Sequence, residues 1–224
     1  GRKRRKASIG LYQADLVDSP LRYTVSKPEA ASFTPLGSTE EVSLRRILEE
    51  HPKGQEYGPI ISSFEEWPLL VDGKGKILSL PPIINSNDLG RITTGTRNVL
   101  IEVTGTNLET VHNTLTIVVS ALAERGGRVY TCLQTYGYKP GRTITPEMKG
   151  RPARVSLDYV NRVLGTSLTL GEASRYLRRA GYRTKPAKRG EIAVEVPPYR
   201  LDIMHPVDLV EDVVIAMDLN NLKP

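Results

Sequence analysis

The chain has 224 residues, of which 39% are hydrophobic, and a formal net charge of +6. This length and composition suffice for one large or two modest globular domains with a packed core. The longest nearly apolar stretch, residues 115–123, is far shorter than the roughly 20 residues of a membrane-spanning helix, which argues against one. A single cysteine, Cys132, cannot form an internal disulfide, so we expect a reducing, cytoplasmic compartment.

The positive charge is concentrated at the start of the chain. The rest of the sequence is nearly balanced, with 26 basic and 25 acidic residues. This pattern argues against a global polyanion-binding surface and leaves two interpretations of the basic start, a local phosphate contact or a solvated tail. The residues concerned are Arg2, Lys3, Arg4, Arg5 and Lys6.

The first half of the chain alternates short strand patterns with loops. Residues 7–12 suit a strand, residues 18–38 are rich in proline and read as loop, and residues 44–50 predict a short amphipathic helix. Two apolar strands are expected within residues 69–80, joined by a hairpin-like turn at Asp-Gly-Lys-Gly. Residues 99–104 alternate and predict another strand.

The clearest helix is predicted over residues 107–125. Apolar residues recur at steps of three and four, Asn107 suits the N-cap, and a Gly-Gly pair follows. The apolar face of this helix should lie on a sheet. A few helices joined to strands by irregular loops favour an α+β fold with an antiparallel sheet over a regular parallel array.

A second, smaller domain is expected after residue 150. Residues 137–152 are rich in Gly, Pro, Thr and Lys and read as a linker. Helices over 157–164 and 170–180, a strand over 192–196 and a helix after Pro206 follow, which is the outline of a winged-helix-like module. The predicted domains are therefore residues 1–149 and 150–224.

Common catalytic signatures are absent: there is no phosphate-binding glycine loop, zinc-ligand spacing or Gly-x-Ser-x-Gly motif. The three histidines, His51, His112 and His205, lie far apart in sequence, and His112 falls on the expected polar side of the 107–125 helix. We therefore expect structural roles for all three.

Residues 78–106 are unusually polar for a connection between strands. Their side chains could gather at one end of a sheet and hold a polar substrate or a water, or they could simply satisfy loop backbone groups. Residue chemistry alone favours the second interpretation. The candidates are Ser79, Asn85, Ser86, Thr93, Thr94, Glu102 and Thr104.

Acidic residues cluster near the final helix. Asp208, Glu211 and Asp212 stand at i, i+3 and i+4 and should repel one another, with Asp202 just before the helix. A cation such as Mg²⁺ would relieve the repulsion. Favourable interaction of acids with the positive end of a helix is an equal alternative, and it explains Asp208 best.

Seven segments of the chain carry a family resemblance. They are KRRKASIGLY (3–12), PLLVD (68–72), LSLPPIINS (78–86), GRITT (90–94), IEVTG (101–105), ALAERGG (121–127) and RLDIMHPVDLVEDVVIA (200–216). These segments resemble the β subunit of phenylalanyl-tRNA synthetase of the archaeal and eukaryotic type. They occur in the family's order and extend from residue 3 almost to the end of the chain.

The resemblance implies that residues 1–149 form an editing domain, which hydrolyses tyrosine wrongly esterified to the phenylalanine tRNA. Matched by position, the implied pocket contains Leu70, Ser79, Asn85, Glu102 and Thr104. Glu102 and Ser79 would recognise the tyrosine hydroxyl, and Thr104 would orient water. Archaeal relatives often have Asp where this chain has Glu102, so the carboxylate here is one methylene longer.

The resemblance also gives the acidic residues a role. Asp202, Asp208, Glu211 and Asp212 match the positions of the family's Mg²⁺ ligands, in a site shared with the α subunit. Aminoacylation with ATP would belong to the assembled α2β2 tetramer acting on the phenylalanine tRNA.

Two rival interpretations involve no catalysis by this chain. In one, the chain is a scaffold whose second module binds RNA or a partner subunit through a basic helix face. In the other, that helix binds duplex DNA, which the acidic stretch at 202–218 fits poorly. The basic face comprises Arg175, Arg178, Arg179 and Arg183.

Overall fold

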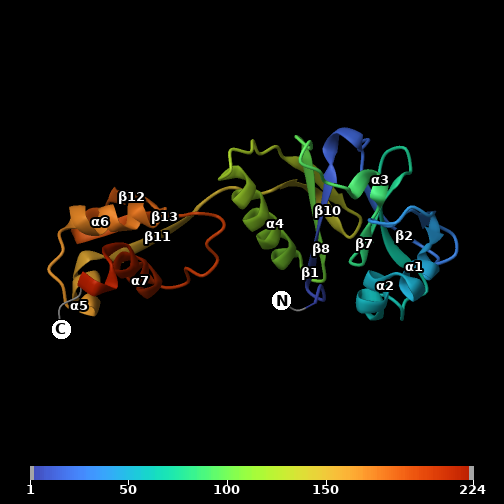
Figure 1. Cartoon of the computed structure of the whole chain (residues 1–224). Helices are drawn as coiled ribbons and strands as arrows, with labels where there is room; N and C mark the ends of the chain where they lie inside the picture. The colour runs from blue at the N-terminus through green and yellow to red at the C-terminus, as the bar shows by residue number, and fades with distance from the viewer. Residues whose placement is uncertain (1–2, 222–224) are drawn as a thin grey trace. The chain divides into compact units, whose positions relative to one another are not determined.

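The computed structural model describes residues 3–221 and divides the chain into two compact units, residues 1–122 and 123–224 (Figure 1). This division falls earlier than the predicted boundary near residue 150, because residues 123–149 contribute a hairpin to the second unit. The overall α+β class with antiparallel sheets is confirmed. Among the described residues, no helix is both long and apolar enough to cross a membrane.

The first unit contains two main antiparallel sheets. β1 (Ala7–Gln13) pairs with β8 (Val99–Gly105), and Gly10 lies opposite Glu102. The second sheet has the order β2-β5-β6-β7. Its strands are β2 (Arg22–Ser26), β5 (Trp67–Val71), β6 (Ile77–Leu80) and β7 (Ile84–Asn85), and a separate short pair consists of β3 (Ser32–Phe33) and β4 (Val42–Ser43).

Strand β2 corrects the prediction of a continuous loop over residues 18–38. Four of its five residues are exposed, so β2 lacks the alternation of buried and exposed positions that would indicate a half-buried strand. It forms as an edge strand because β5 offers a free edge, with Arg22 opposite Val71 and Ser26 opposite Trp67. Tertiary pairing decides this element.

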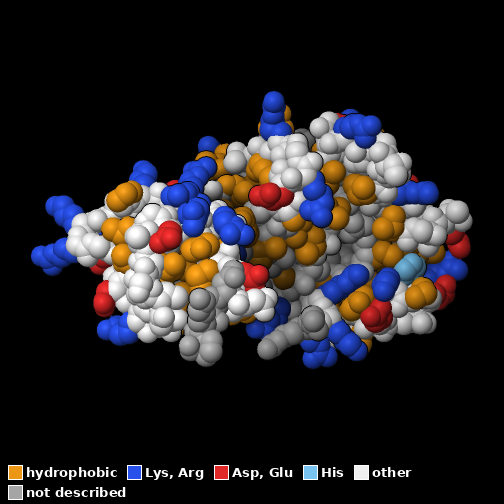
Figure 2. Space-filling model, turned by 60° about the vertical axis from the view of Figure 1, so that its left-hand side comes forward, with side chains coloured by type: hydrophobic (Ala, Val, Ile, Leu, Met, Phe, Trp, Pro, Cys, Tyr) orange, Lys and Arg blue, Asp and Glu red, His pale blue; other side chains and the backbone are white. Residues whose placement is uncertain are grey.

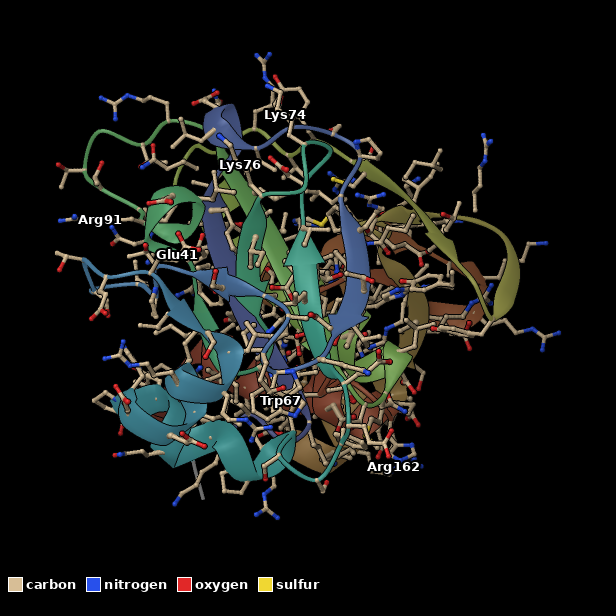
Figure 3. All side chains as sticks on the ribbon, turned by 90° about the vertical axis from the view of Figure 1, so that its right-hand side faces the viewer. Glu41, Trp67, Lys74, Lys76, Arg91 and Arg162 are labelled. Carbon is tan, nitrogen blue, oxygen red and sulfur yellow. The ribbon has the colours of Figure 1, made fainter. Side chains whose placement is uncertain are left out.

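Short helices cover the end of the four-stranded sheet. The predicted helix is confirmed as α1 (Leu44–Glu50), capped by the Ser43 hydroxyl, and α2 (Pro52–Tyr57) follows it. Trp67 lies where these helices meet the sheet, and the turn bearing Lys74 and Lys76 is at the opposite end (Figure 3). The core here comprises Phe33, Leu44, Ile47, Ile61, Trp67, Leu69, Val71, Leu80 and Ile83.

The long helix is confirmed as α4 (Leu108–Ala123), and the Asn107 side chain accepts a hydrogen bond from the backbone N–H of Thr110. It starts beside the β1–β8 ladder (Figure 1), where a Cβ on Gly105 would lie 2.9 Å from a Val111 methyl. His112, predicted on the polar side of this helix, is partly buried. Its Nε2 is buried and has no hydrogen-bond partner among the described residues.

The second unit begins with a hairpin of β9 (Cys132–Tyr136) and β10 (Lys139–Thr145). The predicted linker over 137–152 is therefore wrong for residues 139–145, which gain backbone hydrogen bonds from β9 despite their Gly, Pro and Thr content. The next strand, β11 (Arg151–Ser156), lies in a sheet of order β11-β13-β12, with β12 at Arg183–Pro186 and β13 at Glu191–Val196.

All three helices predicted for the second module are present. They are α5 (Leu157–Leu164), α6 (Leu170–Arg179) and α7 (Pro206–Met217), and Pro206 occupies the first turn of α7 as expected. Helices and sheet share one core built from Val155, Val160, Leu177, Ile192, Val194, Val196, Leu209 and Val213, among others. This module therefore has its own hydrophobic interior.

Candidate functional site

A cavity of about 440 Å³ lies in the first unit, between the β1–β8 ladder and the β6–β7 end of the four-stranded sheet. It is lined by backbone and side chains from residues far apart in sequence. Three of the predicted site residues, Ser79, Asn85 and Glu102, line it. The structure therefore brings together three polar residues, of which the outermost, Ser79 and Glu102, are 23 positions apart in the sequence.

Tyr12 joins these polar groups, although sequence reasoning did not select it. Its side chain is fully buried, and its hydroxyl oxygen lies 2.9 Å from Ser79 Oγ, 3.1 Å from Glu102 Oε2 and 3.4 Å from Asn85 Oδ1. Asn85 is held in turn by its Nδ2, which donates to the Leu11 carbonyl at 3.2 Å. Four side chains thus share one connected polar cluster.

Two glycines allow the strands and the helix to approach this cluster. A Cβ on Gly10 would lie 2.4 Å from Glu102 Oε2 and 2.5 Å from the Tyr12 hydroxyl. A Cβ on Gly90, at the end of α3 (Asn87–Gly90), would lie 2.5 Å from the Cβ of Asn85. All three distances are too short for a residue with a Cβ unless its neighbours move.

Glu102 carries the unusual electrostatics of the site. Burial raises the pKa of its carboxyl, and the nearby hydroxyls of Thr104 and Tyr12 oppose part of the increase. Oε1 is buried without a hydrogen-bond partner among residues 3–221, whereas Oε2 contacts Tyr12. A buried acceptor left unpaired costs free energy, on the order of 1–3 kcal/mol, which a ligand hydroxyl can recover.

The remaining predicted residues lie outside the cavity lining. Thr104 lies two pairs further along the ladder than Glu102, and its hydroxyl is 2.9 Å from that of Ser8, which does line the cavity. Leu70 is 6% exposed and packs in the core with Tyr12, Leu78 and Leu89. Leu70 therefore belongs to the same hydrophobic cluster as the Tyr12 ring.

Two other polar candidates of the 78–106 segment, Ser86 and Thr93, satisfy local backbone groups. Ser86 is buried and caps α3 by accepting from the N–H of Leu89. Thr93 accepts from the N–H of Gly95 and is bonded to Thr96, whose hydroxyl accepts from the N–H of Thr93. For these residues the structural interpretation weighed from the sequence is confirmed.

Basic residues line the same cavity. Arg4 is docked, since its guanidinium donates to the carbonyls of Pro82 and Ile83 at 2.9 and 2.7 Å and lies 4.1 Å from the centre of the Tyr57 ring. The solvated-tail interpretation therefore fails for Arg4. Lys53 also lines the cavity, and its ammonium is paired with Glu56 at 2.9 Å.

His51 lines the cavity as well, but its ring is committed to a helix start. Its Nδ1 accepts a hydrogen bond from the N–H of Lys53 at 3.1 Å. Burial and the Lys53 charge lower the pKa of the imidazole, so the neutral form carries its proton on Nε2. His51 can thus donate a hydrogen bond, but no free basic nitrogen is available to accept a proton.

The acidic cluster of the second unit is organised by one arginine. Arg200 donates to Asp202 at 2.6 Å and to Asp212 at 2.8 Å, and Tyr182 donates to Asp212. Hydrogen bonding to Arg200 lowers the pKa of Asp202. The acids relieve their repulsion with this internal cation.

Asp208 and Glu211 behave differently from that pair. Asp208 accepts from the N–H groups of Met204 and His205, both at 2.6 Å, and caps α7, which lowers its pKa; Glu211 is exposed. Across residues 3–221, no three His, Cys, Asp or Glu side chains converge as a metal site. The donor set as placed does not by itself fit Mg²⁺, and the predicted metal role stays a prediction.

The residues missed from the sequence had one detectable signal. Ser8, Gly10 and Tyr12 alternate along β1 and therefore point to the same face of the strand. Nothing in the local sequence shows that this face meets β6 and β7. The Tyr12 hydroxyl and the Gly10 backbone become site components only through that long-range packing.

The second unit defines the class of protein. Residues 153–218 match the family model described as the tRNA synthetase B5 domain. The second unit is thus similar to a domain found in tRNA synthetases. The predicted helix-turn-helix and strand module falls within this match.

The whole chain is more specifically homologous to archaeal phenylalanine–tRNA ligase β subunits. It is 42% identical over 224 residues to the β subunit of Pyrococcus horikoshii and 43% identical over 225 residues to that of Thermococcus gammatolerans, which covers all of this chain and 40% and 39% of those relatives. The chain therefore spans about two fifths of their length.

A solved structure supports the same relationship. An N-terminal fragment of the phenylalanyl-tRNA synthetase β subunit from Pyrococcus horikoshii matches with a TM-score of 0.91 and 41% identity, over 97% of this chain and 61% of that one. The resemblance expected from the sequence is confirmed, and so is the fold class.

Proposed function

We propose that the first unit hydrolyses tyrosine from a phenylalanine tRNA that was charged with the wrong amino acid. One observation carries this proposal: Glu102 lines a cavity, and its buried Oε1 has no hydrogen-bond partner among the described residues. Tyrosine differs from phenylalanine by one hydroxyl, which can donate to such an acceptor. A site built to hydrogen-bond a hydroxyl strongly rejects the analogue that lacks it.

The charges around the cavity suit an aminoacyl-tRNA end. Arg4 and Lys53 provide positive charge that favours a phosphate-bearing substrate, while Ser79 and Asn85 add neutral polar groups. Lys and Arg side chains also project from many points of the surface shown in Figure 2. Recognition of the amino acid and of the nucleic acid would then use different sides of one cavity.

Hydrolysis in this site would depend on positioning more than on acid–base chemistry. His51 lacks a free basic nitrogen, and Glu102 is assigned to recognition. Water placed by Thr104, Ser8 and backbone groups, and oriented by the substrate's own ribose hydroxyl, would attack the ester carbonyl. The bond from the carbonyl carbon to the ribose oxygen would break, the ribose oxygen would leave as a hydroxyl with a proton from the water, and tyrosine would be released as its carboxylate with loss of a proton to solvent. Correct placement alone can supply a large part of a rate enhancement.

In the complete protein, we propose that this chain serves as part of a phenylalanine–tRNA ligase β subunit. An α subunit would provide the ATP-dependent aminoacylation of the phenylalanine tRNA, and cytoplasmic location follows from that role. Mg²⁺ would be held only with ligands from the α subunit, since no three acidic, His or Cys side chains converge among residues 3–221. The ligands from this chain would be Asp202, Asp208, Glu211 and Asp212. The partner's oxygen ligands would have to displace Arg200 from the acids.

The editing proposal is tested with the purified chain and the phenylalanine tRNA charged with either tyrosine or phenylalanine. We expect selective release of tyrosine, and we expect Glu102→Ala and Thr104→Ala to lose that selectivity. Glu109→Ala, at an exposed position in the first turn of α4, is the matched control and should retain it. Unchanged hydrolysis in both site variants would reject the site.

A second outcome separates editing from the scaffold interpretation. Release of neither amino acid by a folded sample would show that this chain does not edit. The scaffold interpretation would then be favoured, with the second module contacting RNA or the partner subunit.

A further inference from the structure

Tyr12 is the most completely buried polar side chain in contact with the candidate site. It is 0% exposed, lies on β1, and places its hydroxyl between groups from β6, β7 and β8. Its ring packs in a small core with Leu70, Leu78 and Leu89. The packing holds the ring still, so the position of the hydroxyl is determined by the fold.

We infer that Tyr12 is a positioning residue, which holds the Glu102 carboxylate by one oxygen and so leaves the other for a substrate hydroxyl. This inference rests on the proposed function and deepens it by assigning specificity to a residue outside the cavity lining. Tyr12 is not among the residues lining the cavity, whereas its partners Ser79, Asn85 and Glu102 are. It acts through them.

The number of available protons determines the direction of each hydrogen bond around the Tyr12 hydroxyl. The phenol has one proton, and an ionised carboxylate is the strongest of its three neighbouring acceptors, so Tyr12 donates to Glu102 Oε2. The Ser79 hydroxyl, 2.9 Å away, can then donate to the Tyr12 oxygen. Asn85 Oδ1, at 3.4 Å, makes the weakest contact.

This order uses Oε2 and leaves Oε1 without a hydrogen-bond partner in the part of the chain that the structure describes. The longer Glu side chain has one more rotatable bond than Asp, so its carboxylate needs an external anchor to present a defined oxygen. Gly10 admits the anchor, because its missing Cβ leaves room for both Tyr12 and Glu102. The Tyr12 anchor, the space at Gly10 and the oxygen left for a ligand therefore belong to one arrangement.

Other charged and titratable groups also face Glu102. Burial is the main cause of the raised pKa of Tyr23 on β2, and the nearby Glu102 charge is the second cause. Arg4, His51 and Lys53 line the same cavity as Glu102. A change at Tyr12 must therefore be read against these groups, which the substitution leaves in place. Direct titration of Glu102 isolates the Tyr12 contribution.

The test compares Tyr12→Phe with Tyr182→Phe. Both substitutions remove a hydroxyl that donates to a carboxylate from a buried ring, but Tyr182 belongs to the second unit, where it contacts Asp212. For Tyr12→Phe we expect kcat/KM for release of tyrosine to fall about 10-fold relative to release of phenylalanine. Tyr182→Phe should leave this ratio unchanged, and equal losses in both variants would overturn the inference.

A spectroscopic measurement tests the hydrogen bond from Tyr12 to Glu102 without relying on activity. NMR titration of the ¹³C-labelled Glu102 carboxyl, assigned by its loss in Glu102→Gln, should show a higher midpoint in Tyr12→Phe, because the phenol hydrogen bond favours the charged form. An unchanged midpoint would overturn the inference. If the wild-type chain releases no tyrosine but the midpoint moves, the editing proposal fails while the hold of Tyr12 on Glu102 stands.

Discussion

Individual side chains in the first unit make contacts that their local sequence does not reveal. Glu102 occupies an alternating strand and would be expected to face solvent, yet its carboxylate is enclosed between two sheets. Tyr12 would be expected to be an ordinary core aromatic, yet its hydroxyl connects three polar neighbours. In both cases the function of the residue depends on what packs against the strand face.

The raised pKa of Glu102 gives the site a pH-dependent stability. A carboxyl whose pKa is higher in the folded chain than its unfolded value of about 4.3 stabilises the fold at low pH, and this stabilisation is lost as pH rises through the folded pKa. Glu102→Gln removes the penalty of ionisation. We therefore expect this variant to have a higher Tm than wild type at pH 7 and a similar Tm near pH 4, by calorimetry.

A Tm difference that became smaller with increasing pH would contradict this prediction. Together with the expected loss of tyrosine selectivity, a more stable Glu102→Gln variant would indicate that the site retains a destabilising carboxylate for function.

At the scale of elements, the candidate site depends on how loops are tied to strands. The segment from Pro81 to Ile83 connects β6 and β7 and lines the cavity, and the Arg4 guanidinium binds two of its carbonyls. The basic start of the chain thus has a structural contact within its unit. Arg5, the next residue, is exposed.

Replacing Arg4 should loosen this connection. Arg4→Ala removes two hydrogen bonds from a charged donor, and we expect it to lower the free energy of unfolding by about 1 kcal/mol, measured by urea denaturation. Arg5→Ala is the matched control, with the same change of charge and little expected effect. Equal destabilisation by the two variants would show that net charge, and not docking, matters at this end.

At the scale of the molecule, hydrophobic cores are confined to single units. Leu177 belongs to the core of the second module, whereas Leu80 belongs to the core behind the four-stranded sheet. Both side chains are fully buried. Each unit therefore has its own source of stability.

Core truncations should act on one unit each. Leu177→Ala and Leu80→Ala should each cost about 2–5 kcal/mol, because each leaves a cavity in a packed interior. Hydrogen exchange should accelerate in α6 and β13 for the first variant and in β5 and β6 for the second. Faster exchange across both units from either variant would show that they unfold as one.

The sequence by itself was enough to predict most regular elements and the family. Periodicity and capping residues located α1, α4, α5, α6 and α7, because these signals are local and repeat along each helix. The strands around the Asp-Gly-Lys-Gly turn were predicted for the same reason. Asn107 and Pro206 took their expected positions at helix starts.

Only the tertiary structure decided the edge strand β2, the β9–β10 hairpin and the composition of the candidate site. The β9–β10 hairpin pairs strands that are neighbours in sequence, but the Gly, Pro and Thr content of β10 resembles that of a linker. The mostly exposed β2 forms because the edge of β5, which is distant in sequence, satisfies its backbone. The same holds for Tyr12, whose hydroxyl meets Ser79, Asn85 and Glu102 across 67 to 90 residues. Long-range packing brings these groups within hydrogen-bonding distance, and no local pattern encodes that distance.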